Sequence, residues 1–490
     1  MWSLQFYIIA LFLFDSPVTG SHFRYATVSC RPALDNALVV TCSWRSAWRL
    51  DFGPCEKPCT QANVGNLSVT SSSFADWQCF SGCGFFLNMA PHRYYVTAID
   101  STDDWQQGEN EFSFTLPHSG AFSFGFAECC WVPLETGSLK SIKVTTKYNA
   151  GIRNDTGKPN ASPVTTSNPL VSMDITCGYQ FDIPSVDADG DIVRCRWAIG
   201  YAECGNVCGP LPGSTLYPNC SLIIPSSKRS LYGSGFYAVA IMLEDFPATD
   251  ITQGGVQKDE TTPLSKVPLQ YLARIKDGCN CGNPPTFTTP PETKNLRAGQ
   301  TFTKDLIAFY PSGITAINVI PPTGANVGAM VTVNGTTASV NITLTATPAQ
   351  HGHHLICYQA FGANRCPGPY LCDKIVVVDG GWCTYSDWSD CSVTCENGTQ
   401  TRSRECQCPE PAHGGATCVG ATTETQSCSG PPCPVDGGWC TYSDWSDCSV
   451  TCENGTQTRS RECQCPEPAH GGATCLTVDG ARTAIGVIAQ

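Results

Sequence analysis

Hydrophobic residues recur in short alternating runs through residues 21–378, and these runs are bounded by Gly, Pro, Asn and Asp. A period of two places successive side chains on opposite faces of a β-strand. Val193, Cys195 and Trp197 share one face of such a run, whereas the continuous apolar run at 236–243 is typical of a central sandwich strand. Because helical periodicity is scarce, the pattern predicts an all-β, multidomain chain of disulfide-rich, β-sandwich-like modules.

Turn-forming residues divide this part of the chain near 149–163 and 279–285. We therefore expect a cysteine-rich all-β module at 21–150, a β-sandwich at 151–280 and another β-sandwich at 281–377. The three segments hold eight, six and four cysteines. These even numbers allow pairing within each module, although they leave the connectivity open.

The cysteine content indicates the compartment. The 490 residues include 32 cysteines, which is typical of a protein that matures in an oxidising, extracellular environment. Cys129 and Cys130 are adjacent in the sequence, so we expect them to bridge to different partners.

Charge and motifs exclude several function classes. The net charge of −13 argues against nucleic acid as the main partner. The chain contains no G-x-S-x-G, H-E-x-x-H or P-loop motif, and oxidised cysteines cannot serve as nucleophiles. We expect a protein that is not an enzyme and has no organic cofactor.

The amino terminus is typical of a secretory signal peptide. Phe6–Phe14 is an apolar run too short to span a bilayer, and Val18-Thr19-Gly20 predicts cleavage before Ser21. Residues 1–20 are then the signal peptide. No later stretch reaches the roughly 20 apolar residues of a transmembrane helix, so we expect a secreted protein of the extracellular space or matrix.

Asn-x-Ser/Thr sequons support passage through the secretory route, where they are acceptors for N-linked glycans. The chain has eight, at Asn66, Asn154, Asn160, Asn219, Asn334, Asn341, Asn397 and Asn454. We expect a glycoprotein.

The carboxyl-terminal part contains an internal repeat. Val378–Cys418 recurs without a change at Val435–Cys475, so 41 residues are repeated at an offset of 57. The first copy continues to 434, whereas the second is followed by an unrelated tail at 476–490. The repeats are therefore placed at 378–434 and 435–475.

Each copy carries aromatic residues at i, i+3 and i+6, here Trp382, Tyr385 and Trp388, followed by Arg402 and Arg404. Rings at this spacing line one side of an extended segment, and arginines two apart point to one face of a strand. Guanidinium groups can then insert between the rings, at about 0.5–2 kcal/mol per contact. The second copy has the same set at Trp439, Tyr442, Trp445, Arg459 and Arg461.

The pattern of aromatics, Cys391-Ser-Val-Thr-Cys395, Gly398, the two arginines and the later cysteines resembles the thrombospondin type 1 repeat. The resemblance implies three disulfides in the first copy, Cys391 with Cys428, Cys395 with Cys433 and Cys406 with Cys418. Two cysteines are additional to the family pattern, and we expect Cys383 to pair with Cys408.

The family resemblance also implies modification sites and a ligand surface. Trp388 and Trp445 fit the motif for tryptophan C-mannosylation, and Thr394 and Thr451 fit that for O-fucosylation. Tyr385 replaces a family tryptophan, and a glutamine stands where a third basic residue is common. The expected ladder, meaning the alternating stack of rings and arginines in each copy, is therefore shorter and less basic than in heparin-binding members.

The second copy lacks the last two cysteines of the pattern, which leaves Cys448 and Cys452 without partners in the family scheme. One interpretation is a disulfide-linked dimer through these two residues. The other is that the sequence ends inside a longer array of repeats.

A looser resemblance concerns the upstream modules. The strand that begins at Gly235 and ends at Asp245 is similar to the last strand of cadherin-like or fibronectin-like sandwiches. Ser21–Phe246 resembles, in style, extracellular matrix proteins of invertebrates. A cadherin-like or Ig-like sandwich is accordingly expected at 281–377.

Asp187, Asp189 and Asp191 place carboxylates at i, i+2 and i+4, which suits a Ca²⁺ loop. An EF-hand is excluded because Ile192 and Ala198 occupy the positions that need Gly and Glu. The remaining interpretations are a lone Ca²⁺ site and an Asp-Gly turn before a strand.

Together these features predict a secreted modular glycoprotein of the extracellular matrix or cell surface that mediates adhesion. Its repeats would bind matrix proteins or sulfated glycans through the ladder, with cell-surface receptors as further partners. The alternatives are the ectodomain of a membrane adhesion receptor and a soluble immune-recognition factor.

Overall fold

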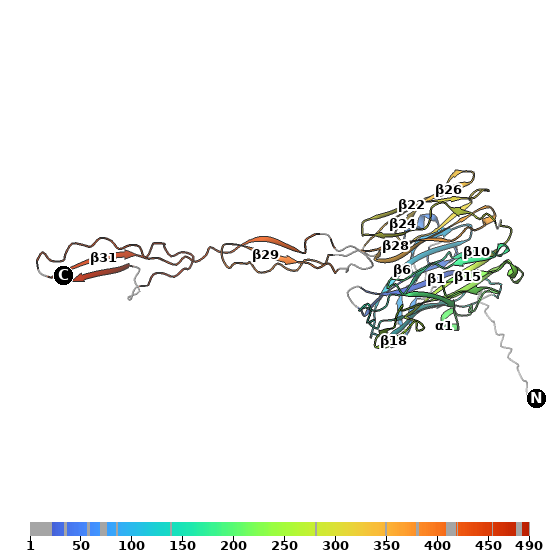
Figure 1. The fold of residues 1–490 in the computed structure, drawn as a ribbon, viewed down its shortest axis with the longest axis horizontal. Helices are drawn as coiled ribbons and strands as arrows, with labels where there is room; N and C mark the ends of the chain where they lie inside the picture. The colour runs from blue at the N-terminus through green and yellow to red at the C-terminus, as the bar shows by residue number, and fades with distance from the viewer. Residues whose placement is uncertain are drawn as a thin grey trace, which may run out of the picture. The chain divides into compact units, whose positions relative to one another are not determined.

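The computed structural model describes residues 22–33, 37–55, 59–68, 76–84, 87–137, 140–279, 282–347, 350–378, 382–407, 418, 420–452, 454–476 and 483–489. Strands account for nearly all of the described regular structure, so the all-β expectation is confirmed (Figure 1). The chain divides into a first unit, 1–381 with 408–417, and a second unit, 382–407 with 418–490. The signal peptide and its cleavage site lie outside the described residues.

The first unit is organised around one twelve-stranded sheet. Its longest path runs β4-β3-β7-β8-β19-β1-β2-β6-β5, and β10, β13 and β16 join it beside β19. The strands are β1 (Phe23–Pro32), β2 (Val39–Trp48), β3 (Trp77–Ser81), β4 (Leu87–Ala90), β5 (Tyr95–Asp100), β6 (Trp105–Thr115), β7 (Ala121–Glu128), β8 (Ile142–Asn149), β10 (Leu170–Asp174), β13 (Ile192–Trp197), β16 (Phe236–Phe246) and β19 (Ser265–Lys276).

Strand β19 joins the first two predicted modules. It pairs antiparallel with β1, where Tyr25 lies opposite Tyr271, and also with β8 and β16. The sheet therefore crosses the boundary predicted near 149–163. Residues 267–273 are buried without a break, so both faces of β19 are covered. Such a strand has no polar alternation that could indicate its neighbours from the sequence.

Short elements complete this half of the first unit. The strands are β9 (Val164–Thr165), β11 (Tyr179–Asp182), β12 (Ser185–Val186), β14 (Thr215–Leu216), β15 (Ser221–Ile224), β17 (Ile251–Gln253) and β18 (Val256–Lys258). The helices are η1 (Gln61–Asn63), η2 (Ile175–Cys177), α1 (Tyr201–Cys204) and η3 (Ser226–Leu231).

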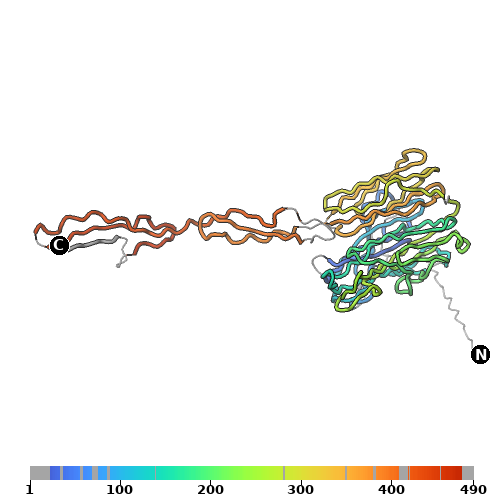
Figure 2. The backbone as a smooth tube through the Cα atoms, in the orientation of Figure 1, coloured from blue at the N-terminus to red at the C-terminus, as the bar shows by residue number. Residues whose placement is uncertain are grey.

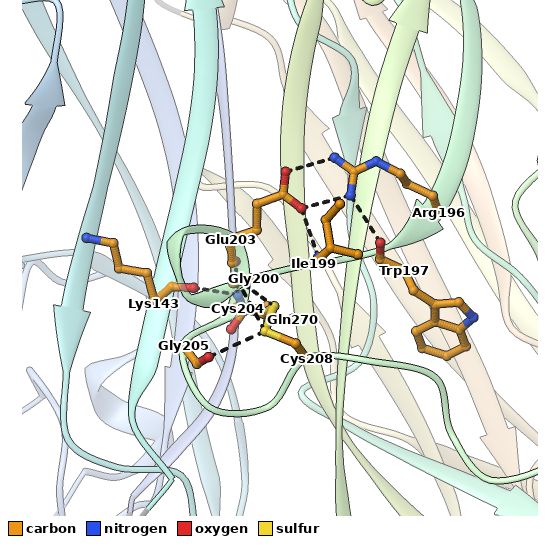
Figure 3. Close-up of a disulfide and its surroundings, with 10 residues drawn as sticks. All are labelled: Lys143, Arg196, Trp197, Ile199, Gly200, Glu203, Cys204, Gly205, Cys208 and Gln270. Atoms are coloured by element: carbon orange, nitrogen blue, oxygen red, sulfur yellow. Dashed lines mark hydrogen bonds and ion pairs between the residues drawn. A yellow bond between two sulfur atoms is a disulfide. The ribbon is translucent and has the colours of Figure 1, made fainter.

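A polar network fixes the single-turn helix α1 to the sheet (Figure 3). The Glu203 carboxylate accepts hydrogen bonds from both terminal nitrogens of Arg196 at 2.8 Å. The Gln270 amide donates to the backbone oxygens of Lys143 and Glu203 at 2.7 and 3.0 Å. With the Cys204–Cys208 disulfide, these bonds hold a helix too short to be stable alone.

The described residues of 282–377 form two β-sheets that share a hydrophobic core. One sheet contains β20 (Thr286–Phe287), β22 (Thr301–Phe309), β24 (Ala325–Val327), β25 (Val331–Asn334) and β26 (Thr337–Thr345), and the other contains β21 (Thr293–Leu296), β23 (Ala316–Ile320), β27 (Gly352–Phe361) and β28 (Leu371–Val377). A short helix, η5 (Ala363–Arg365), follows β27. Buried positions alternate along β22 and meet β27 in a common core, for example Leu306 with Ile356.

This sandwich is fastened to the main sheet within the first unit. The Cys279–Cys366 disulfide links the two parts covalently. Arg365 forms an ion pair with Asp100 at 2.9 Å, and a second one with Asp103. Sandwich and main sheet therefore belong to one compact unit.

The cysteines of 21–150 all pair within that segment. The bonds are Cys30–Cys42, Cys55–Cys59, Cys79–Cys83 and Cys129–Cys130. The expectation that Cys129 and Cys130 bridge to different partners is therefore wrong. The other six cysteines of the segment pair with one another, so Cys129 and Cys130 have no other partner within it.

The second unit consists of extended segments that lie side by side along each repeat (Figure 2). Its strands are β29 (Asn397–Ser403), β30 (Thr423–Ser429), β31 (Thr456–Glu462) and β32 (Thr483–Ala489). β29 pairs with β30 in the first copy, and β31 pairs with β32, from the tail, in the second. Within the part of the chain that the structure describes, no helix has the length and apolarity needed to cross a membrane.

Candidate binding surface of the repeats

The segment that carries the aromatic residues runs beside β29 without forming a regular strand. The backbone amides of Cys383, Ser386 and Ser389 donate to the carbonyl oxygens of residues 405, 403 and 401, each at 2.8 Å. The segment thus advances three residues for every two of β29. This mismatch explains why rings with a period of three align with arginines with a period of two.

The serines of the segment reinforce this register with their side chains. Ser386 Oγ accepts a hydrogen bond from the amide of Ser403 at 3.1 Å, and Ser389 Oγ accepts one from Thr401 at 3.0 Å. The spacing of three between these serines is visible in the sequence, but their bonding to the neighbouring strand becomes evident only in the structure.

Guanidinium groups and rings alternate in the first copy. Arg404 lies 4.3 Å from the ring centroid of Trp382 and 4.5 Å from that of Tyr385. Arg402 lies 4.6 Å from Tyr385 and 4.5 Å from Trp388. Each arginine is therefore held between two rings by cation–π contacts, which leave the edge of the guanidinium group as its hydrogen-bonding surface.

The second copy repeats the ladder with the same order. Arg461 lies 4.8 Å from Trp439 and 4.6 Å from Tyr442. Arg459 lies 4.3 Å from Tyr442 and 4.6 Å from Trp445. The structure thus brings together all ten ladder residues in two sets of five.

The two ladders differ in charge. Glu424 on β30 lies opposite Arg402 and forms an ion pair with it, at 2.7 Å from Nη2 and 2.9 Å from Nε. In the second copy, the residue opposite Arg459 on β32 is Gly486, which has no charge. The edge of Arg402 is thus partly neutralised, and Glu424 is a residue that motif comparison alone did not single out.

The disulfides that the family resemblance implied are present in the first copy. Cys391 is bonded to Cys428, Cys395 to Cys433 and Cys406 to Cys418. Cys408 lies outside the described residues, so its pairing with Cys383 stays a prediction. Its counterpart in the second copy is formed, because Cys440 is bonded to Cys465. Cys448 and Cys452 are free and exposed.

Most predicted modification sites are accessible. Thr394 and Thr451 are exposed, and Trp388 and Trp445 are partly exposed. Seven of the sequon asparagines are exposed, namely Asn66, Asn154, Asn219, Asn334, Asn341, Asn397 and Asn454. These modifications stay predictions.

Asn160 is the exception among the sequons, and its prediction is wrong. Its side chain is fully buried, accepts a hydrogen bond from Arg153 at 2.6 Å and donates one to Asp245 at 2.6 Å. A folded chain with this arrangement has no room for a glycan on the amide nitrogen.

The predicted Ca²⁺ residues surround an arginine. The carboxylates of Asp187, Asp189 and Asp191 lie within 4.8 Å of one another. The guanidinium group of Arg153 forms ion pairs with Asp191 and, at 3.4 Å, with Asp189. Arg153 therefore supplies positive charge where a cation was expected, and Ca²⁺ binding stays a prediction.

The Asp187 carboxyl gives this cluster a pH dependence. Burial and the nearby carboxylate of Asp245 raise the pKa of Asp187 from 3.8 to about 8. The folded state therefore keeps a proton that the unfolded state loses above about pH 4, so this group's contribution to stability falls between pH 4 and pH 8.

Asp187→Asn should remove this dependence, because an amide cannot ionise and its oxygen can still accept from the amides of Asp189 and Asp191. We expect the variant and the wild type to have similar melting temperatures near pH 4, with the variant increasingly more stable toward pH 8. Thermal unfolding at several pH values measures the difference. A constant difference across this range would contradict the assignment.

Family models match two parts of the chain. The thrombospondin type 1 domain matches residues 384–433 and 441–482. The amino-terminal domain of integrin beta-like protein A–E matches residues 24–151, within the part for which the sequence suggested a loose resemblance to extracellular matrix proteins of invertebrates.

Relatives of known name match over the repeats. Thrombospondin-2 of Bos taurus is 48% identical over 123 residues, which is 23% of this chain and 10% of that protein. Semaphorin-5A of Rattus norvegicus is 48% identical over 99 residues, 20% of this chain and 9% of that protein. Hemicentin-1 of Mus musculus is 50% identical over 101 residues, 21% of this chain and 2% of that protein.

The chain thus spans a tenth or less of the length of these relatives. Among solved structures, a titin Ig tandem, A164–A165, aligns with 44% of this chain and 96% of its own at 6% identity, and its TM-score of 0.16 supports no conclusion about the fold. The repeats at 384–433 and 441–482 are thrombospondin type 1 domains, which this chain shares with extracellular adhesion-type proteins.

Proposed function

We propose that the chain is a secreted, glycosylated adhesion protein of the extracellular matrix or cell surface, and that its two ladders bind sulfated glycans. The observation that carries this proposal is the pair of ladders, each of which holds two guanidinium groups between rings. Their edges are fixed in a row, and sulfate oxygens match the donor geometry of a guanidinium group.

The charge of the ladders determines the strength of binding. Each ladder has only two arginines, and Glu424 competes for one of them. The whole chain is also acidic, with a net charge of −13. Affinity for a polyanion is therefore expected to be weak at physiological ionic strength and to rise as salt is removed.

The test is binding of the secreted full chain to immobilised heparin at low salt. The variant with Arg402→Ala, Arg404→Ala, Arg459→Ala and Arg461→Ala should lose most of its binding, because every ladder cation is removed. The corresponding four Arg→Lys substitutions should retain part of it, because charge remains.

A matched control removes two exposed cations of the first unit, Lys294→Ala with Arg297→Ala, and should bind as the wild type does. Unchanged heparin binding by the four-alanine variant would contradict the proposal and place the contact elsewhere. If the control variant also loses heparin binding, the attraction comes from the overall charge of the chain and not from the ladders.

A further inference from the structure

A cavity of about 660 Å³ lies within the first unit, between the main sheet and the sandwich at 281–377. Its floor is formed by β1, β2 and β6, and its opposite side by 322–324 and 350–355. This volume is in the range of small-molecule sites, roughly 300–1,000 Å³. The ladders lie in the second unit, so this cavity is separate from the surface of the proposed function.

Strand register makes the floor polar. Ser29 on β1 lies opposite Ser43 on β2, and Ser43 lies opposite Glu111 on β6. In the next row, Arg45 lies opposite Glu109. The intervening residues point into the hydrophobic core on the other side of the sheet, as Val28 does. The sheet face toward the cavity therefore carries hydroxyl groups and paired charges, whereas the cavity lining as a whole is mostly apolar.

The charges of the floor are balanced. Arg45 pairs with Glu109 at 2.6 Å, and Arg31 pairs with Glu111 at 3.3 Å. Burial raises the pKa of Glu109, but Arg45 and the amide of Thr323 more than offset this and hold it below its usual value. Since each cation already has an anion, an ionic ligand gains no unmatched partner here.

Sheet topology excludes one common way of binding a peptide. β1 lies between β19 and β2, and β2 lies between β1 and β6, so the floor offers no strand edge. A peptide therefore cannot add a strand within this floor. Tyr95, which also lines the cavity, is 38% exposed and offers part of its ring to a ligand.

We propose that this cavity binds a neutral saccharide residue. Sugar hydroxyls both donate and accept, so they can bond to serine hydroxyls and to the outer atoms of the Arg31–Glu111 pair. The apolar C–H face of a sugar ring can pack on the exposed part of Tyr95. A neutral sugar ring leaves the Arg45–Glu109 and Arg31–Glu111 ion pairs intact, whereas a charged ligand would compete with one partner of each pair.

Saturation-transfer NMR on the secreted full chain tests this. The probes are the methyl glycosides of glucose, galactose, mannose, fucose and N-acetylglucosamine, with a set of N-acetylated dipeptide amides as the comparison. We expect transfer to at least one glycoside. Ser43→Phe, which fills the cavity, should abolish this transfer, and Tyr95→Ala should weaken it severalfold.

Both variants should bind heparin as the wild type does, so failure of this site is distinguishable from failure of the ladders. If Ser43→Phe lowers the melting temperature, Tyr95→Ala alone decides the outcome. Absence of transfer to every glycoside, or equal transfer in wild type and Tyr95→Ala, would overturn the proposal. Transfer to dipeptides without transfer to sugars would overturn it in favour of a peptide ligand.

Discussion

Replacing Arg153 by alanine is expected to destabilise the first unit by about 3–5 kcal/mol, because it removes the ion-pair partner of the buried Asp191 carboxylate. The Arg153 side chain is only 2% exposed and forms ion pairs with Asp155 at 2.7 Å, with Asp189 and with Asp191. The same guanidinium group donates to the buried amide of Asn160.

The measurement is the secreted yield and melting temperature of Arg153→Ala. Arg153→Lys is a partial rescue, because it keeps the charge but loses the forked geometry. Arg297→Ala, at an exposed arginine, is the control and should change stability by no more than about 0.5 kcal/mol. A normal melting temperature for Arg153→Ala would show that the cluster does not depend on this residue.

The second large effect is expected for Asp103→Ala, which removes the anion between two arginines. Asp103 lies 2.6 Å from Arg274 of the main sheet, and it also pairs with Arg365 of the sandwich at 281–377. Its side chain is 5% exposed. Loss of the carboxylate leaves the half-buried Arg274 without its anion and leaves Arg365 with Asp100 alone, at an expected cost of about 3–5 kcal/mol.

The pH dependence of this contact follows from the Asp103 pKa. Burial acts to raise the pKa, but Arg274 and Arg365 hold it below its usual value of 3.8. Its contribution is therefore complete above about pH 4 and is lost as the pH falls through the lowered folded-state pKa. The stability difference between wild type and Asp103→Ala should accordingly shrink only in strong acid.

Limited proteolysis and thermal unfolding measure the effect of Asp103→Ala, which should expose the junction to cleavage and lower the melting temperature. Asp51→Asn is the control in the same unit, because its side chain is 59% exposed and its ion pair with the partly exposed Arg49 is worth no more than about 1 kcal/mol. Equal protease resistance in wild type and Asp103→Ala would contradict a role for this cluster in holding the sandwich.

Local periodicity made the ladder predictable. Rings three apart and arginines two apart are both legible in the sequence, and the structure interleaves them as expected. The sandwich at 281–377 was predictable for the same reason, since β22 alternates buried and exposed positions.

Contacts between distant segments could not be predicted in this way. β19 is buried on both faces, so no pattern indicated that it would pair with β1. Arg153 meets Asp191 across 38 residues, and Asn160 is buried only because that cluster forms. Glu424 faces Arg402 through strand register, which depends on the pairing of β29 with β30.

The most direct test of the ladder as a glycan-binding surface is heparin affinity after Glu424→Gln. This change removes the competing charge from Arg402 but keeps the rings and all four arginines. Affinity at low salt should rise about two- to fivefold, as expected for release of an exposed ion pair. Glu396→Gln, which changes the net charge equally at an exposed position of the same repeat, should have a smaller effect. Equal affinities for wild type and Glu424→Gln at every salt concentration would contradict the account.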